Sequence, residues 1–151
     1  LYPAVTVAHH HRGAALQYLV ALQEYEHCIQ EQEDGFRSEI TKVKSYIYHH
    51  YQERNLGAET LSAMVFLSPG YLSAVFKEET GVTLNRFIRE VRMEKAKELL
   101  ETTNMKISGI AKEVGFSNNS YFCRSFREYY GSSPESYRKG NNEDEESSEE
   151  V

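Results

Sequence analysis

Residues 68–81 read "SPGYLSAVFKEETG", and residues 118–131 read "NNSYFCRSFREYYG". The second stretch repeats the first in its aromatic positions, in a basic–acidic pair and in the glycine that closes it. The residues that match at a distance of fifty positions are Tyr71 and Tyr121, Phe76 and Phe126, Lys77 and Arg127, Glu78 and Glu128, and Gly81 and Gly131. The same distance separates Met64 from Val114, Phe66 from Phe116 and Phe87 from Tyr137. The chain therefore contains one small structural unit twice.

Each repeat is predicted to be a helix with its own start and stop signals. The Ser68 hydroxyl can accept a hydrogen bond from the first turn, and Pro69 suits the first helical position because its missing N–H is not needed there. Asn118 can cap the second helix in the same way. Gly81 and Gly131 can end both helices in the left-handed conformation. The residues expected to face inward are Tyr71, Leu72, Val75 and Phe76 in the first helix and Tyr121, Phe122 and Phe126 in the second.

A shorter helix is predicted before each of these helices. Thr60 is the expected N-cap of the first short helix, and Gly115 is expected to close the second. Two short helices joined by a turn of about three residues form a helix-turn-helix. The apolar residues assigned to the short helices are Leu61, Met64, Val65, Ile107, Ile110, Ala111 and Val114. The phenylalanines expected in the core are Phe66, Phe76, Phe116, Phe122 and Phe126.

Residues 84–102, between the two units, have the apolar period of one long helix. Nineteen residues rising about 1.5 Å each give a length of about 28 Å. Successive major-groove faces on one side of B-DNA repeat every ~34 Å. The predicted fold is therefore all-α, with two helix-turn-helix subdomains (homeodomain-like three-helix units) joined by a long central helix. Such a chain can place two recognition helices, at about residues 69–80 and 118–129, in successive major grooves without dimerising.

The flanks of this region are predicted to differ from it. Helices are expected over residues 14–33 and 38–52, separated by Asp34 and Gly35. Residues 1–35 are interpreted as a helical linker or the remnant of an upstream domain, and residues 36–139 as the DNA-binding domain. Within that domain, residues 36–82 form the first helix-turn-helix, 83–103 the connecting helix and 104–139 the second helix-turn-helix. Residues 140–151 are predicted to be a disordered acidic tail.

Charge is distributed unevenly along the chain. The net charge is −6, but residues 36–139 carry sixteen Lys and Arg against twelve Asp and Glu and are therefore basic. Residues 1–35 carry one basic and five acidic residues, and residues 140–151 carry six acidic residues and no basic one. The overall acidity therefore does not exclude a nucleic-acid partner for the middle of the chain.

The sequence predicts neither a membrane protein nor an enzyme. No apolar run approaches the ~20 residues of a membrane span, no signal peptide is visible, and the two cysteines lack a C-x-x-C partner. We therefore expect a reduced, cytoplasmic protein, and the start at Leu1 suggests a fragment or a processed chain. No P-loop, G-x-S-x-G or paired-carboxylate site is present, and Cys28 beside His27 lacks an orienting third group. His9–His11 have no cysteine or acid at ligand spacing, so we predict no metal and no cofactor.

The region resembles the DNA-binding domain of the AraC/XylS family of bacterial transcription regulators. The matching segments are "VKSYIYHHY" (43–51), "LSPGYLSAVFKEETGVTLNRFIREVRMEKAKELL" (67–100) and "KISGIAKEVGFSNNSYFCRSFREYYGSSPESYRK" (106–139). The last segment has the pattern I-x-x-I-A-x-x-V-G-F, then Y-F-x-R-x-F, then G-x-x-P-x-x-Y-R. The resemblance implies that the chain binds asymmetric promoter sites in double-stranded DNA, acts as an activator or sometimes a repressor, and has RNA polymerase as a partner. It is strongest to the subgroup of two-component response regulators with a receiver and a helical linker upstream.

Base contacts are expected from the outward face of each recognition helix. In the second helix these positions are Asn119, Ser120, Cys123 and Arg124. Arg124 can donate two hydrogen bonds to guanine, although a phosphate contact or a solvated charge stays open for it, and Asn119 can pair with adenine. By resemblance Cys123 falls on a contact position, where a small apolar contact to a thymine methyl is favoured over a redox role.

The first recognition helix departs from the family pattern. Its matching positions are Gly70, Ser73 and Ala74, which are small, so we predict a weaker base readout there, or a reading of groove shape or thymine methyls. The residues expected to contact the DNA backbone are Lys77, Arg127, Arg89 and Arg86. Arg92 is left open between a phosphate contact and a salt bridge between the subdomains.

Two other interpretations of the chain remain. One is a DNA-binding or interaction module of a larger repair enzyme or multidomain sensor. The other is a protein-interaction module, in which the apolar stripe over residues 14–30 forms a homodimer as a short coiled coil. A homodimer could also be formed by an upstream domain.

Overall fold

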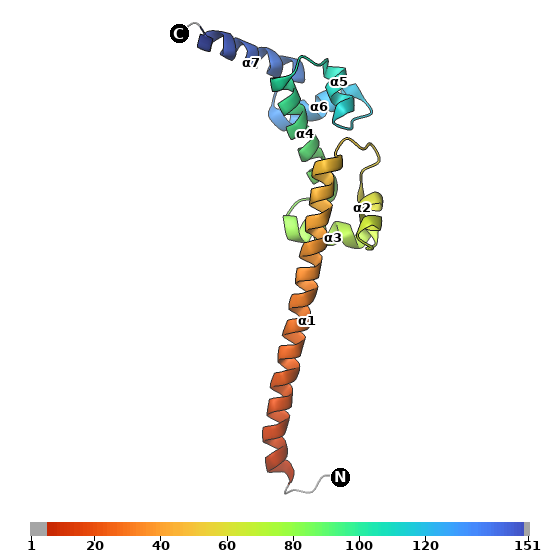
Figure 1. Ribbon diagram of the computed structural model, residues 1–151, viewed down its shortest axis with the longest axis vertical. Coiled ribbons are helices and arrows are strands. Elements are labelled where there is room, and N and C mark those ends of the chain that lie inside the picture. The colour runs from red at the N-terminus through yellow and green to blue at the C-terminus, as the bar shows by residue number, and fades with distance from the viewer. Residues whose placement is uncertain (1–5, 150–151) are drawn as a thin grey trace. The chain divides into compact units, whose positions relative to one another are not determined.

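The fold was described from a computed structural model, which covers residues 6–149 and omits the side chains at positions 6–15, 18, 28, 31–34, 36 and 143–149. These residues form helices and no strand, so the all-α prediction is confirmed. The helices are α1 (Thr6–His50), α2 (Ala58–Met64), α3 (Pro69–Thr80), α4 (Leu84–Thr102), α5 (Ile107–Glu113), α6 (Asn119–Tyr130) and α7 (Pro134–Glu149) (Figure 1). The chain divides into two compact units, residues 1–39 and 40–151, and both helix-turn-helices lie in the second.

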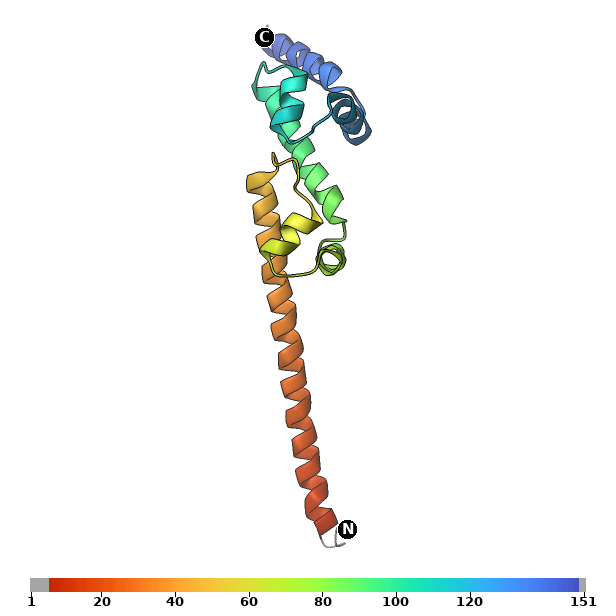
Figure 2. The same cartoon turned by 90° about the vertical axis from the view of Figure 1, so that its right-hand side faces the viewer.

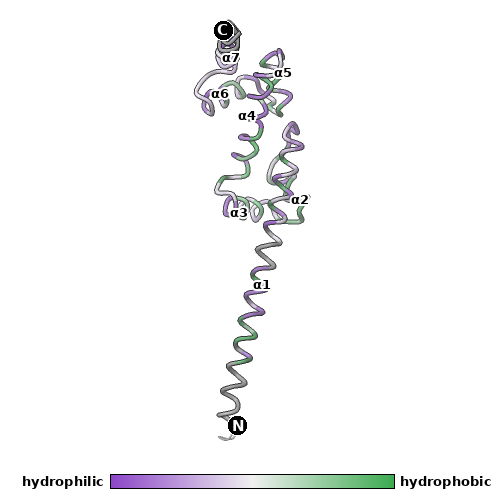
Figure 3. Tube along the Cα trace, turned by 60° about the vertical axis from the view of Figure 1, so that its left-hand side comes forward, coloured by the Kyte–Doolittle hydropathy of each residue, from purple (hydrophilic) through white to green (hydrophobic). Residues whose placement is uncertain are grey.

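The predicted break between two N-terminal helices is wrong, because α1 continues through Asp34 and Gly35. A glycine inside a helix costs only up to about 1 kcal/mol, which helical residues on both sides can offset. In residues 1–39 the apolar side chains that the structure describes are exposed. Apolar and polar stretches follow one another along α1 in Figure 3. The large exposed apolar residues are Leu16, Leu19, Val20, Leu22, Tyr25 and Ile29.

The first helix-turn-helix packs on the end of α1 and on the first half of α4. Phe76 and Leu72 of α3 are completely buried, and Phe87 of α4 meets Phe76 edge to face at 5.3 Å. The edge-to-face arrangement adds a favourable quadrupole interaction to the burial of both rings. The buried residues of this first core are Ile40, Val43, Ile47, Leu56, Leu61, Val65, Leu72, Phe76, Leu84, Ile88 and Val91.

The second helix-turn-helix builds a separate core on the second half of α4. Phe122 and Phe126 of α6 are completely buried at its centre, 6.0 Å apart. The buried residues of this second core are Met93, Ala96, Leu100, Ile110, Ala111, Val114, Phe116, Phe122 and Phe126. Helix α4 therefore belongs to both cores, and the change from one to the other falls between Val91 and Met93.

The caps of α3 and α6 confirm the repeat. Ser68 accepts a hydrogen bond from the N–H of Tyr71 at 3.3 Å, and Asn118 accepts one from the N–H of Tyr121 at 3.0 Å. Gly81 and Gly131 end the two helices with φ of 79° and 82°. In both cases the glycine N–H donates at 2.8 Å to the carbonyl four residues earlier.

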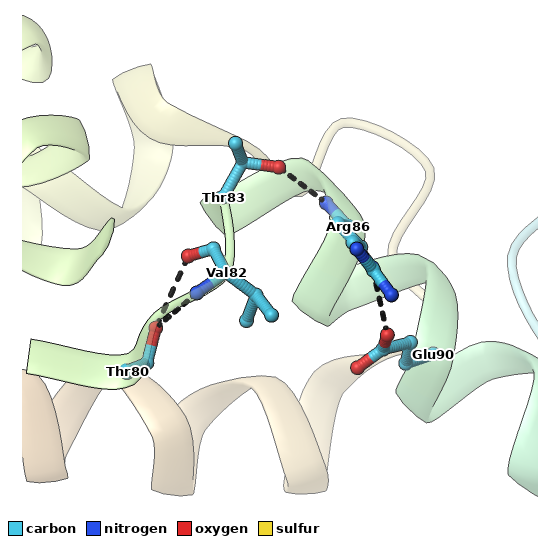
Figure 4. Close-up of polar contacts among 5 residues, drawn as sticks. All are labelled: Thr80, Val82, Thr83, Arg86 and Glu90. Carbon is cyan, nitrogen blue, oxygen red and sulfur yellow. Dashed lines mark hydrogen bonds and ion pairs between the residues drawn. The ribbon is translucent and has the colours of Figure 1, made fainter. Parts of the chain in front are cut away.

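The repeat extends into α4 and α7. Thr83 caps α4 by accepting the N–H of Arg86 at 3.3 Å, and Ser133 caps α7 by accepting the N–H of Ser136 at 3.2 Å. Figure 4 shows the α3–α4 junction, in which the Thr80 hydroxyl also accepts the N–H of Val82 at 3.4 Å. Tyr137 of α7 meets Phe126 edge to face at 5.7 Å, as Phe87 meets Phe76. Each recognition helix is thus fixed to the helix that follows it.

The turns of the two units differ, and this corrects the pairings of Phe66 with Phe116 and of Met64 with Val114. Val65 and Val114 are the equivalent buried residues, so the second turn is one residue longer. Phe66 instead corresponds to Gly115, has a φ of 57° and is 95% exposed, while Phe116 is 6% exposed. The prediction that Phe66 packs in the core is therefore wrong, and its left-handed backbone costs about 1–2 kcal/mol.

Two local expectations also need correction. Helix α2 begins at Ala58 with Gly57 as the N-cap, and Thr60 lies at the third position, where its hydroxyl accepts the N–H of Gly57 at 3.1 Å. The expected disorder from residue 140 onward differs from the structure, in which α7 continues to Glu149. Glutamate favours helices, and the first turns of α7 are held by packing of Tyr137, so the helix can extend into the acidic segment.

Candidate nucleic-acid interface

Helices α3 and α6 lie on the same side of residues 40–151, one near each end of α4 (Figure 2). Their side chains follow the same pattern of exposure. Gly70 and Ser120 are exposed at the start of each helix, and Ala74 and Arg124 are exposed one turn later. Ser73 and Cys123 are half-buried in both. The residues predicted to read bases therefore form one outward face on each helix, and the two faces are structurally equivalent.

The outward face of α6 carries polar groups that are free to bind. Within the described part of the chain, Arg124 has no hydrogen-bond or ion-pair partner, and its guanidinium lies over the Tyr121 ring at 5.7 Å. Stacking on an aromatic face holds a guanidinium in place while its N–H donors stay available. Asn119 Oδ1 accepts a weak hydrogen bond from the Cys123 thiol at 3.8 Å. This leaves the two N–H donors of the Asn119 amide for a base edge.

Cys123 is a neutral thiol in this setting. Burial raises the pKa of the Cys123 thiol, and the negative charge of Glu135 raises it further. The thiolate is the form that reacts with oxidants and electrophiles and that binds metals. A neutral, half-buried sulfur one turn into α6 suits an apolar contact better than redox chemistry, as the sequence suggested.

The outward face of α3 presents only backbone groups and small side chains to a base edge. Gly70 has no side chain, Ala74 has one methyl group, and Ser73 is half-buried. At these positions α3 can approach a groove closely but can make few hydrogen bonds. The two equivalent faces thus differ in chemistry while they match in geometry.

Four basic residues were predicted to contact the DNA backbone, and the structure separates them into two groups. Lys77, Arg89 and Arg127 are exposed and have no hydrogen-bond or ion-pair partner within the described part of the chain. Arg86 is also exposed, but its Nε donates to Glu90 Oε1 at 3.0 Å (Figure 4). Glu90 is half-buried, but ion pairs four residues apart on a helix surface contribute only about 0.3–0.5 kcal/mol, so a phosphate can replace Glu90.

A hollow of about 380 Å³ brings Arg89 together with the first turn of α6. Asn85, Arg89 and Tyr121 contribute polar groups to it. Tyr121 and its equivalent Tyr71 are 44% and 45% exposed, so the prediction that both face inward is wrong. Sequence reasoning placed both in the core because an aromatic at a repeated position indicates a core. The signal that could have found them is their place in the first turn, next to the caps.

The structure gives no sign of a metal centre or a membrane segment in the residues that it describes. No group of three or more His, Cys, Asp or Glu could hold a metal ion there. None of the helices searched in that part of the chain has the length and apolar character needed to cross a membrane. The side chains of His9–His11 and Cys28 lie outside the described residues.

Comparison with known proteins identifies the family. Residues 61–140, more than half of the chain, match a family profile described as a helix-turn-helix domain. The C-terminal domain of AraT, a response regulator from Geobacillus stearothermophilus, superposes with a TM-score of 0.66 and 34% identity, over 68% of this chain and 84% of that one. The chain belongs to the AraC/XylS family. Members of this family are DNA-binding transcription regulators and not enzymes.

Two further proteins are similar to about two thirds of this chain. The regulatory protein PocR of Salmonella typhimurium (strain LT2) is 39% identical over 106 residues, which are 70% of this chain and 35% of PocR. The DNA-binding domain of AdpA, a global transcriptional factor solved in complex with a target DNA, has a TM-score of 0.64 and 28% identity, over 67% of this chain and 90% of that one. The chain spans about a third of the length of the curated relatives that it matches first.

Proposed function

We propose that the chain is the output domain of a transcription regulator and that it reads one asymmetric site in promoter DNA. Helices α3 and α6 would enter successive major grooves on one side of the duplex. The observation that carries this proposal is the combination of equal geometry and unequal chemistry on the two outward faces. Gly70, Ser73 and Ala74 occupy the places on α3 that Ser120, Cys123 and Arg124 occupy on α6. A protein with two different reading faces in one chain recognises a site without two-fold symmetry.

In this proposal α6 supplies most of the base readout. Arg124 would donate to guanine O6 and N7, and Asn119 would donate to an acceptor on adenine, while Ser120 and Cys123 contact neighbouring edges. On α3, Gly70, Ser73 and Ala74 would allow close approach to the groove. Lys77, Arg127, Arg89 and Arg86 would contact phosphates, which fixes the register without specifying sequence.

Selection of binding sites from random DNA duplexes with residues 36–151, which lack the exposed apolar side chains at positions 16–29, tests this proposal. The expected result is one non-palindromic site with two short blocks about one helical turn apart, one of them more strongly specified. The affinity for that site should fall steeply with salt concentration, so the selection is repeated at two salt concentrations. Enrichment of a palindrome, or of a single block only, would contradict reading by both helices of one chain.

The wider regulatory context is also a proposal. AraT is described as a response regulator, and we propose that this chain likewise acts downstream of a receiver domain. RNA polymerase would be the second partner, contacted once the domain is on DNA.

Self-association through the N-terminal segment is the remaining proposal. The exposed apolar side chains of α1 within residues 16–29 would pack against a second copy as a two-stranded coiled coil. We expect sedimentation to give a dimer mass for the 151-residue chain and a monomer mass for residues 36–151. A monomer mass for the full chain at tens of micromolar would exclude a dimer made by this segment alone.

A further inference from the structure

One arginine of α4, Arg92, connects the two helix-turn-helix subdomains. It lies between Val91 of the first core and Met93 of the second. Its Nε donates to the carbonyl oxygen of Tyr51 at 2.8 Å, and its Nη2 donates to the carbonyl oxygen of Glu53 at 2.6 Å. Both carbonyls follow the end of α1 and belong to the first subdomain.

The other side of the Arg92 guanidinium faces the second subdomain. Its Cζ lies 5.9 Å from the centre of the Phe116 ring, which is a cation–π distance. Burial lowers the pKa of Arg92, yet an arginine remains charged in proteins. The guanidinium is therefore held by hydrogen bonds to one subdomain and by a ring contact with the other.

Gly115 lets the two subdomains approach at this point. A methyl group there would lie 2.7 Å from the carbonyl oxygen of Tyr51 and 3.0 Å from Arg92 Nε. The Tyr51 ring packs against both cores, and Lys95 Nζ lies 6.0 Å from its centre. The segment after α1 therefore lies between Arg92 and the turn that contains Gly115, and it contacts both.

We propose that Arg92 is a positioning residue for DNA recognition, which fixes the spacing and angle between α3 and α6. The two cores share α4 and the partly buried Tyr51 but no fully buried residue, so the stiffness of the pair depends on α4, on Tyr51 and on the Arg92 contacts. A stiff connection raises the effective concentration of the second reading helix once the first is bound, but only at one spacing of the site. The inference rests on the proposed function, since it gives a cause for selectivity between block spacings.

The test uses the selected site and variants in which the two blocks are moved apart or together by one to three base pairs. The native chain should prefer one spacing. Arg92→Met keeps an unbranched side chain but removes both hydrogen bonds, and we expect about a tenfold loss of affinity at the best spacing and a flatter spacing profile. Affinity for a single block should stay unchanged. Arg92→Lys keeps the charge but lacks the planar guanidinium that donates both hydrogen bonds. Its dependence of affinity on block spacing should lie between those of the native chain and Arg92→Met.

Arg138→Met is the matched control. Arg138 also donates to backbone carbonyls, those of Leu100, Thr103 and Met105, but all three lie in α4 and the segment after it. Its loss should destabilise the second subdomain without changing the preferred spacing. A flattened profile in Arg138→Met, or an unchanged one in Arg92→Met, would overturn the proposal.

A measurement without DNA separates this proposal from the proposed function. Spin labels at Ala63→Cys and Lys112→Cys, two exposed positions on α2 and α5, report the distance between the subdomains in a chain with Cys28→Ser and Cys123→Ser. Arg92→Met should broaden the distance distribution, and Arg138→Met should not. If no bipartite site is ever selected, the proposed function fails while this readout still decides the role of Arg92. An equally narrow distribution in Arg92→Met would contradict it.

Discussion

Replacing Arg124 by alanine is expected to weaken binding to the selected site by about 1–3 kcal/mol, which is roughly 5- to 150-fold in affinity. Arg124 is exposed on the first turns of α6, and its guanidinium lies over the Tyr121 ring. The loss of sequence specificity should be confined to one base pair, because the bidentate contact to guanine that discriminates against other bases is removed there. Competition assays with single-base variants of the site measure both effects.

Arg127→Ala is the control for Arg124→Ala on the same helix. It removes the same charge from an exposed position one turn further along α6. A phosphate contact contributes equally at every sequence, so Arg127→Ala should lower all affinities alike and reduce the salt dependence by about one counterion. If Arg124→Ala behaves in this way too, Arg124 binds a phosphate and the base readout on α6 lies with other residues.

The fold could be predicted from the sequence because the local signals agree with each other. Ser68, Asn118, Gly81 and Gly131 mark helix ends through groups that bond within one turn, and the structure confirms all four. The bounds of α4 follow from its apolar period in the same way. Such signals depend on neighbours in the chain and not on the tertiary structure.

The predictions that failed concern side chains whose positions depend on tertiary contacts. An offset of fifty aligned Phe66 with Phe116, but the second turn has one extra residue, so Phe66 corresponds to Gly115 and is exposed. Tyr71 and Tyr121 look like core residues in a repeat, although the first turn of a helix leaves them half-exposed. Arg92 could not be assigned because its partners are backbone carbonyls about forty positions away. Every residue has such a carbonyl, so the sequence does not indicate which of them accepts a hydrogen bond.

The largest expected effect on stability is that of Gly115→Ala. Two costs combine there, because Gly115 has a φ of 95° and a Cβ would lie 2.7 Å from the carbonyl oxygen of Tyr51. The left-handed backbone costs an alanine about 1–2 kcal/mol, and overpacking adds about 1–3 kcal/mol. We expect the free energy of unfolding, measured by urea denaturation, to fall by about 3 kcal/mol.

Gly131→Ala separates the two costs. Gly131 has a φ of 82°, and nothing lies within 4 Å of a Cβ built there. Its substitution should therefore cost only the backbone term, about 1–2 kcal/mol. Equal losses in the two variants would mean that the segment after α1 yields easily to the new methyl group. The nearest atom to that methyl is a backbone oxygen, so adding Arg92→Met to Gly115→Ala should not restore stability. A restored stability would show that the overlap of the new methyl group with Arg92 Nε at 3.0 Å, and not its overlap with the Tyr51 carbonyl oxygen at 2.7 Å, causes the extra loss.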